Sequence, residues 1–257
     1  MKILEVKNLS FSAGNKLILK DVNLSICRGE YVLLSGLNGS GKSTFLKILA
    51  NNIDSKQYTN FKVDGHILDK NDCDVLEDKN REVFGKTICY VPQEDCFVGS
   101  TILEELKITL SFSGFKVNNN EIIKLLERLQ LSKALLSIDE SVTEIGKILK
   151  LKPEKLSGGQ KKLVSIISAV VKCEQADICL IDEPLNNLDI KHVRAICNLL
   201  TYINRNLGKA IILVSHCRVF PNISAEYMFE NGQIIRQEKQ NCYACFGKPD
   251  EQGYYDL

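Results

Sequence analysis

The stretch Gly36–Thr44, which reads GLNGSGKST, decides the fold because it lies between an apolar run at 30–36 and a helix-like segment at 41–52. Its glycines allow backbone N–H groups to point inward at phosphate oxygens, and the start of a helix adds positive potential. The stretch fits the pattern G-x-x-x-x-G-K-[ST] without a mismatch. We therefore expect a bound nucleoside triphosphate, with Lys42 at its β- and γ-phosphates and Ser43 as a magnesium ligand.

The composition is that of a globular protein with one sizeable core. The chain has 257 residues, 44% of them hydrophobic, and its 33 Lys and Arg residues balance 32 Asp and Glu residues. A nucleic-acid-binding protein usually carries an excess of positive charge, so no nucleic acid is expected as a partner. The N-terminal residues lack the apolar block of a signal peptide, and no apolar run approaches the roughly 20 residues that span a membrane. The sequence therefore predicts a protein that is soluble on its own.

Strands and helices alternate along most of the chain. Strands are predicted at 3–11, 17–26, 30–36, 61–68, 87–93, 177–184, 209–216 and 227–237. Tight hairpin turns are predicted at Asp64-Gly65 and Asn231-Gly232. Helices are predicted at 41–52, 118–131, 161–173 and 191–208. Apolar strands that alternate with helices imply a parallel sheet covered on both faces, and the helical block at 101–156 is interpreted as an insertion into it.

Polar residues end two further apolar strands. The segment ICLIDEP buries its apolar residues and leaves Asp182 and Glu183 at its carboxyl end, where ligands bind in such sheets. Asp182 suits magnesium, and Glu183 suits a general base that polarises an attacking water. His216 ends the strand IILVSH in the same way. The other histidines, His66 and His192, lie in surface contexts and are expected to be inert.

A second phosphate-binding turn is predicted well after the first. The segment LSGGQ at 156–160 opens a helix with Ser157, Gly158 and Gly159. The N–H groups and the dipole at such a helix start favour a phosphate. A single bound nucleotide does not need two cradles, so the second one requires another explanation.

The order of these motifs resembles that of the ATP-binding cassette (ABC) ATPase family. GLNGSGKST is followed by YVPQ, LSGGQ, LIDEP, NNLD and VSH, and the match extends to about Arg236. The resemblance implies an α/β fold: a P-loop NTPase (RecA-like) core with an N-terminal antiparallel β subdomain and an inserted α-helical subdomain. The implied division is 1–93 and 161–240 for the β subdomain and core, 94–160 for the helical subdomain and 241–257 for a loose C-terminal tail.

The resemblance also explains the second cradle. In this family two cassettes pack head to tail, and the LSGGQ signature of one closes over the ATP on the P-loop of the other. Ser157, Gly158, Gly159 and Gln160 would then contact the partner's nucleotide, and Asp189 would contact the partner across the dimer. The implied partner is a second ABC ATPase subunit, either a copy of this chain or a related one.

The remaining roles are implied position by position. Phe11 matches an aromatic residue that stacks on adenine, although it is also explained as a core residue. Gln93 matches a glutamine that contacts magnesium and water, and His216 matches a histidine that contacts the γ-phosphate. Lys42 and Glu183 complete the implied catalytic set. The implied ATP-binding positions within the chain are Phe11, Gly36, Asn38, Gly39, Ser40, Gly41, Lys42, Ser43 and Thr44, and the implied magnesium ligands are Ser43, Gln93 and Asp182.

Three uses of such an ATPase fit the sequence. The favoured one is the ATP-binding and ATP-hydrolysing subunit of an ABC transporter, attached to separate integral membrane subunits on the cytoplasmic face of the membrane. Phe97 and Ile102 are then candidates for the groove that grips the membrane subunit, the alternative being that they only pack the insertion. The other uses are a soluble ABC ATPase without a transport role, for example of the iron–sulfur assembly type, and a non-hydrolysing ATP-dependent dimerisation module. The presence of Glu183 argues against the last.

The ten cysteines indicate reduced thiols in a cytosol, since no export signal is present. Most lie among apolar residues, as Cys89 and Cys179 do, where cysteine acts as a small hydrophobic side chain. Cys242 and Cys245 form the only C-x-x-C pair. This pair suits half of a zinc site or a redox pair, but no second cysteine pair completes it.

Overall fold

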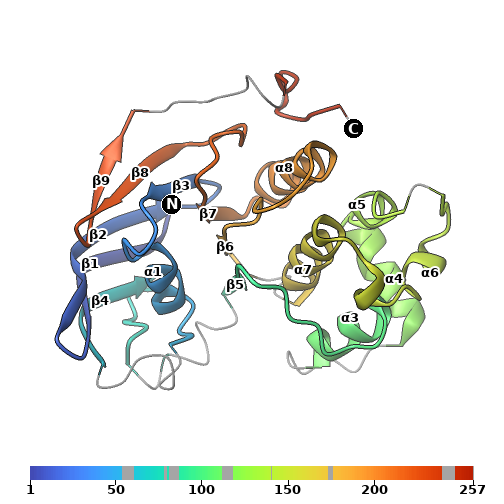
Figure 1. Cartoon of the computed structure of the whole chain (residues 1–257). Coiled ribbons are helices and arrows are strands. Elements are labelled where there is room, and N and C mark those ends of the chain that lie inside the picture. Colours follow the sequence, from blue (N-terminus) through green and yellow to red (C-terminus); the bar gives the residue numbers. More distant parts are fainter. Residues whose placement is uncertain are drawn as a thin grey trace.

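The computed structural model describes residues 1–53, 61–77, 80, 87–111, 118–139, 141–172, 176–238 and 247–256. Figure 1 shows two sheets and helix α1 on one side of the molecule and the helical insertion on the other. The expected α/β architecture is confirmed, with a parallel core sheet, an N-terminal antiparallel sheet and inserted helices.

The central sheet is mostly parallel. Within the described residues its strand order is β5 (Ile88–Val91), β6 (Ile178–Asp182), β7 (Ala210–Val214), β3 (Tyr31–Gly36), β8 (Ala225–Glu230) and β9 (Gln233–Gln237). Only the β8–β9 pair is antiparallel, and it is joined at the predicted Asn231-Gly232 turn. Every residue of β6 and β7 is buried, as expected for parallel strands that are covered on both faces.

The N-terminal sheet is antiparallel, in the order β2 (Lys16–Cys27), β1 (Lys2–Ala13) and β4 (Phe61–Asp69). The hairpin turn predicted at Asp64-Gly65 is wrong, because β4 is one continuous strand. Gly65 instead lies where the β1 backbone comes close: a Cβ atom on it would be 2.6 Å from the carbonyl oxygen of Asn8. Glycine is therefore needed at this position because it lets the two backbones approach each other closely.

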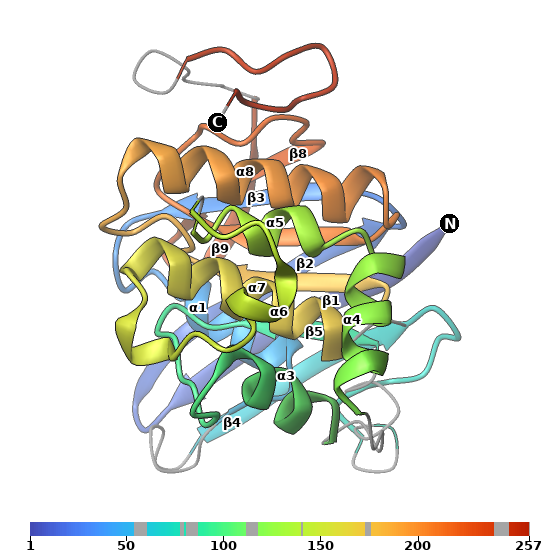
Figure 2. The same ribbon diagram turned by 90° about the vertical axis from the view of Figure 1, so that its right-hand side faces the viewer.

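The two faces of the central sheet belong to two different cores. Successive side chains of a strand point to opposite faces. Leu34 packs into the core that the antiparallel sheet shares with α1 (Lys42–Leu49), and Leu33 packs into the core that contains α7 (Gly158–Lys172) and α8 (Ile190–Arg205). Figure 2 shows α7 and α8 lying across that second face. The sheet is thus held rigidly from both sides.

The insertion consists of short helices that extend the second core. They are α3 (Ile102–Ser111), α4 (Asn119–Arg128), α5 (Ser132–Leu136), α6 (Ile145–Ile148) and the 3₁₀ turn η1 (Pro153–Lys155). Ile102 is fully buried in this core, so its assignment as a contact for a membrane partner is wrong, whereas Phe97 is only partly buried against it. Across the described residues, no helix is both long and apolar enough to cross a membrane.

The C-terminal segment 247–256 packs on α8. The Asn198 side chain donates to the carbonyl oxygen of Tyr255 at 2.7 Å and accepts from its N–H at 2.6 Å. The Tyr255 ring is buried, and its hydroxyl donates to the carbonyl oxygen of Val219. The loose tail expected over 241–257 is therefore wrong for this segment.

The described cysteines carry free thiols: Cys27, Cys73, Cys89, Cys96, Cys179, Cys197 and Cys217. Cys89, Cys179 and Cys197 are buried among apolar side chains, as predicted. The pair Cys242 and Cys245 lies outside the described residues. Among those residues, no group of three or more His, Cys, Asp or Glu side chains is arranged to hold a metal ion.

Candidate nucleotide-binding site

The loop that follows β3 leads directly into α1, and Lys42 is the first residue of that helix. Its side chain folds back over the loop, so that Nζ donates hydrogen bonds to the carbonyl oxygens of Gly36 at 2.7 Å and Leu37 at 2.9 Å. Only 6% of Lys42 is exposed. This burial lowers the pKa of the amine, against the opposing effect of two nearby carboxylates. The amine is thus held at the centre of the loop, where a phosphate would meet it.

Ser43 and Asp182 bring oxygen atoms together beside this amine. The Ser43 hydroxyl donates to Asp182 Oδ1 at 3.1 Å and ties the start of α1 to the end of β6. Asp182 is 2% exposed; burial raises the pKa of its carboxyl, and the hydrogen bond from Ser43 acts in the opposite direction. Gln93, which follows β5, lines the adjoining cavity. Hydroxyl, carboxylate and amide oxygens are ligands that Mg²⁺ prefers, so these side chains fit that ion.

Glu183 follows β6 in a left-handed conformation with φ of 45°, which is uncommon for residues other than glycine. Its N–H donates to the carbonyl oxygen of Val214 at 2.9 Å, and its side chain is buried. Burial raises the pKa of the Glu183 carboxyl, and the charges of His216 and Lys42 oppose this shift. His216 Nε2 lies 3.2 Å from Glu183 Oε1 and 2.9 Å from Asn38 Oδ1. Because Nε2 faces two oxygen acceptors, it carries a proton.

These groups surround one cavity of about 540 Å³. Lys16, Ile18 and Asn186 also line it and were not expected from the sequence; Lys16 and Ile18 are brought there by the turn between β1 and β2. Gly36, Ser40 and Asp182 were expected at the site and are not part of the lining itself. The lining residues are Lys16, Ile18, Asn38, Gly39, Gly41, Lys42, Ser43, Thr44, Gln93, Glu183, Asn186 and His216.

Phe11 does not provide a stacking surface for adenine, so that prediction is wrong. Its side chain is 0% exposed and belongs to the core between the antiparallel sheet and α1. Its ring centroid lies 6.0 Å from that of Phe61. The alternative assignment as a core residue is correct. Among the described residues, the cavity lining contains no aromatic side chain other than the imidazole of His216.

The LSGGQ signature lies outside this cavity, at the start of α7. Ser157 and Gln160 form a capping box there: the Ser157 N–H donates to Gln160 Oε1 at 2.8 Å, and the Gln160 N–H donates to Ser157 Oγ at 3.3 Å. Asp189 is the N-cap of α8. A Cβ atom on Gly158 would lie 3.8 Å from the side chain of Leu188, so the two helix starts are neighbours. The structure thus brings the signature together with Asp189 and not with its own P-loop.

A family model described as ABC transporter matches residues 19–186, which contain both the P-loop and the LIDEP segment. The match covers more than half of the chain and includes the buried groups that surround the cavity. The chain therefore belongs to the ABC transporter family.

Individual relatives place it within that family. The energy-coupling factor transporter ATP-binding protein EcfA1 of Fusobacterium nucleatum is 31% identical over 91% of this chain and 81% of that protein. The petrobactin import ATP-binding protein YclP of Bacillus subtilis is 29% identical over 91% of this chain and 86% of that protein. The dimeric post-hydrolysis structure of the ATP-binding cassette MJ0796 with ADP and Pi has a TM-score of 0.73 and 29% identity, and covers 92% of this chain and 98% of that one. This chain is an ATP-binding subunit of an ABC transporter, and its family implies ATPase activity.

Replacing Lys42 by alanine should lower the affinity for ATP by about 100-fold or more, because the loop loses its charged donor to the phosphates. Calorimetric titration with ATP would measure the change. Lys209→Ala is the matched control, since Lys209 is also buried and also donates to a backbone carbonyl, that of Ala176, but does not line the cavity. The control should keep its affinity within about twofold. Unchanged affinity in the Lys42 variant would contradict the site.

Proposed function

We propose that this subunit hydrolyses magnesium-bound ATP as half of a head-to-tail dimer and drives separate membrane-spanning subunits from the cytoplasmic face of a membrane. The observation that supports hydrolysis most directly is the buried Glu183 carboxylate, which reaches the cavity together with Lys42 and is paired with His216. Burying a carboxylate costs free energy, so a module that only bound ATP would gain nothing from placing one there.

The phosphates would occupy the space above the P-loop. Lys42 already lies across the loop, so a small rotation brings its amine from the carbonyl oxygens to the β- and γ-phosphates. Ser43, Asp182 and Gln93 are the side chains that would hold Mg²⁺, which when bound neutralises charge on the phosphate oxygens. The hydrogen bond between Ser43 and Asp182 keeps two of these oxygens in place before the ion arrives.

Glu183 is the group that would orient the attacking water and accept its proton. Burial raises the pKa of its carboxyl, which makes the carboxylate a stronger base than an exposed glutamate. The proton on His216 Nε2 holds Glu183 Oε1 on one side. The same Nε2 is available to donate to the γ-phosphate when the phosphate replaces Asn38 as its second acceptor. These residues thus position the water, the base and the phosphate relative to one another.

The signature would complete the site of a second subunit. Its residues do not line the cavity of their own chain, yet the first turn of α7 presents N–H groups and a positive dipole end. A γ-phosphate held between the P-loop of one subunit and Ser157 of the other would attach the subunits to each other, and hydrolysis would release them. The similar cassette MJ0796 has been solved as a dimer with ADP and Pi, which supports this arrangement.

A buried lysine connects the cavity to the insertion. Lys162 lies in the second turn of α7, and its Nζ donates to the carbonyl oxygens of Pro92 at 3.1 Å and Gln93 at 2.9 Å and pairs with Asp95 at 2.7 Å. The backbone at Gln93 is therefore attached directly to α7. Val98, which is 74% exposed, follows on the same segment and offers an apolar contact to a membrane subunit. Movement of α7 would thus be passed through Lys162 and the segment that carries Val98 to the membrane subunit.

Glu183→Gln should bind ATP as tightly as the unmodified chain but release phosphate at least about 100-fold more slowly, because the base is lost while the shape is kept. A phosphate-release assay at saturating ATP and Mg²⁺ measures the turnover, and calorimetry checks the affinity. Turnover within about twofold of normal would show that Glu183 is not the base.

The membrane partner can be sought with the same variant. Tagged Glu183→Gln protein, mixed with detergent-treated native membranes, ATP and Mg²⁺, should retain a multi-spanning membrane protein in stoichiometric amount. Adding Val98→Glu should reduce this capture, because a charge would enter the apolar contact. Ile235→Glu, at an exposed residue of β9 outside the nucleotide cavity, is the matched control and should leave capture unchanged. Recovery of soluble partners alone would contradict the transport role.

A further inference from the structure

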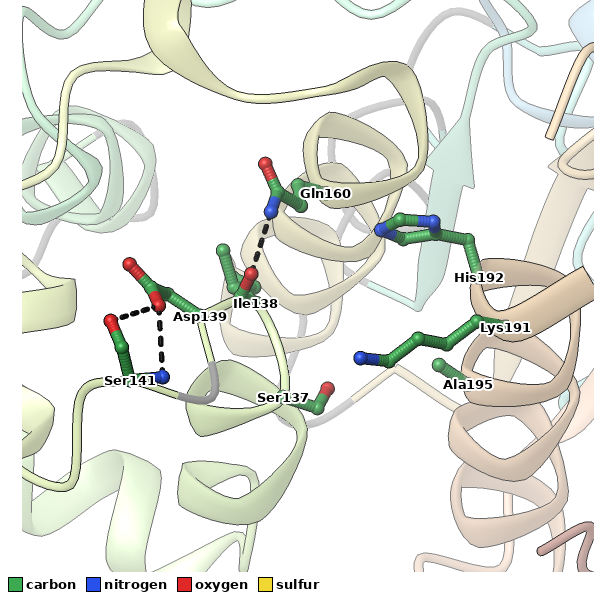
Figure 3. A pocket seen from close by; sticks show the side chains of 8 residues that line it. All are labelled: Ser137, Ile138, Asp139, Ser141, Gln160, Lys191, His192 and Ala195. Carbon is green, nitrogen blue, oxygen red and sulfur yellow. Dashed lines mark hydrogen bonds between the residues drawn. The ribbon is translucent and has the colours of Figure 1, made fainter. Parts of the chain in front are cut away.

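His192 lies between the signature and Asp189. Its side chain is only 18% exposed, although the sequence placed it in a surface context. A Cβ atom on Gly159 would lie 2.2 Å from His192 Cγ and 2.5 Å from His192 Cβ. The imidazole therefore covers the Cα atom of Gly159 so closely that only glycine fits beneath it. Figure 3 shows the ring reaching from α8 toward the first turn of α7, where Gln160 lies.

The same imidazole holds the carboxylate of Asp189. Nδ1 lies 2.9 Å from Asp189 Oδ1 and 2.8 Å from Oδ2, and the backbone N–H of His192 donates to Oδ1 at 2.9 Å. Because Nδ1 faces two carboxylate oxygens, it carries a proton. These hydrogen bonds hold the pKa of the Asp189 carboxyl below its ordinary value. The side chain of Asp189 is nevertheless 64% exposed, so it is oriented and still accessible from outside the chain.

A cavity beside this contact is lined by residues of the insertion and of α8. It has a volume of about 440 Å³ and lies between residues 137–139 with Ser141 on one side and the start of α8 on the other. Gln160 is tied to the insertion, since its Nε2 donates to the carbonyl oxygen of Ile138 at 2.6 Å. In Figure 3 Lys191 extends from α8 into this space. The first turn of α7 contacts the start of α8 where Gly159 meets His192 and where Gly158 lies beside Leu188.

We propose that His192 is a positioning residue that joins the signature turn to Asp189, so that both reach the nucleotide of the partner subunit as one unit. The inference rests on the proposed head-to-tail dimer and adds a residue to it. It predicts that loss of His192 lowers ATP hydrolysis at the nucleotide site of the partner and not at the site of its own chain. A residue needed only for folding would damage both.

Mixed dimers with differently tagged chains test this prediction. One chain carries Glu183→Gln, so that the only hydrolytic site combines the P-loop of the intact chain with the signature of the Glu183→Gln chain. His192→Ala on the Glu183→Gln chain should lower ATP turnover by about tenfold, as expected when a hydrogen bond to a charged group is lost. The same substitution on the intact chain should leave turnover within about twofold. Equal loss in both arrangements, or no loss in either, would overturn the role of His192.

Two further variants separate positioning from stability. His66→Ala removes another histidine–aspartate pair, with Nδ1 2.6 Å from Asp74 Oδ2, at a place away from the signature, and should leave turnover unchanged in both arrangements. His192→Gln keeps a side-chain N–H donor and should restore at least about half of the lost turnover. A loss for His66→Ala equal to that for His192→Ala, or no recovery with His192→Gln, would count against the inference. The mixed dimer without a His192 substitution must form with ATP; if it does not, the dimer proposal itself fails and the inference falls with it.

Discussion

The parallel register of β5, β6, β7 and β3 is the constraint on which the rest of the structure depends. Asp182 pairs with Val214, and Val214 pairs with Leu34, so these strands end at one edge of the sheet. Residues of the P-loop, Glu183, His216 and Gln93 follow these strand ends and line one cavity, and Asp182 lies at the end of β6 beside it. Residues far apart in the sequence meet there because the carboxyl ends of parallel strands lie at the same edge of the sheet, which is where ligands bind in such folds.

The site is assembled from charges that are costly to bury and that compensate one another. Lys42, Asp182 and Glu183 are each almost fully buried. Burial lowers the pKa of the amine and raises the pKa of the two carboxyl groups, while the opposite charges act against each shift. Replacing one of these charged residues by a neutral one would destabilise the site, because a buried charge would be left without its opposite charge. Tight packing on both faces of the sheet provides the rigidity that such an arrangement requires.

Features that a local pattern specifies were predictable, and features that depend on distant contacts were not. The P-loop and the acids after β6 carry their chemistry and their flanking elements within a few residues. The sequence shows Phe11 only as an aromatic residue in a strand. That its ring is buried follows from the packing around it, which the sequence does not reveal. Asp64-Gly65 is a common turn sequence, but here Gly65 lies within a strand, where it leaves room for the close β1 backbone. The hydrogen bond of Tyr255 to Val219 and the contact of His192 with Gly159 come only from the tertiary fold.

In the proposed mechanism two subunits complete each site, and the most direct test is ATP turnover per chain across a series of protein concentrations. With ATP and Mg²⁺ saturating, turnover per chain should be low in dilute solution, rise with protein concentration and level off where light scattering shows the dimer. Turnover that is high and constant while light scattering shows only monomer would contradict the account, because one chain would then be sufficient for hydrolysis.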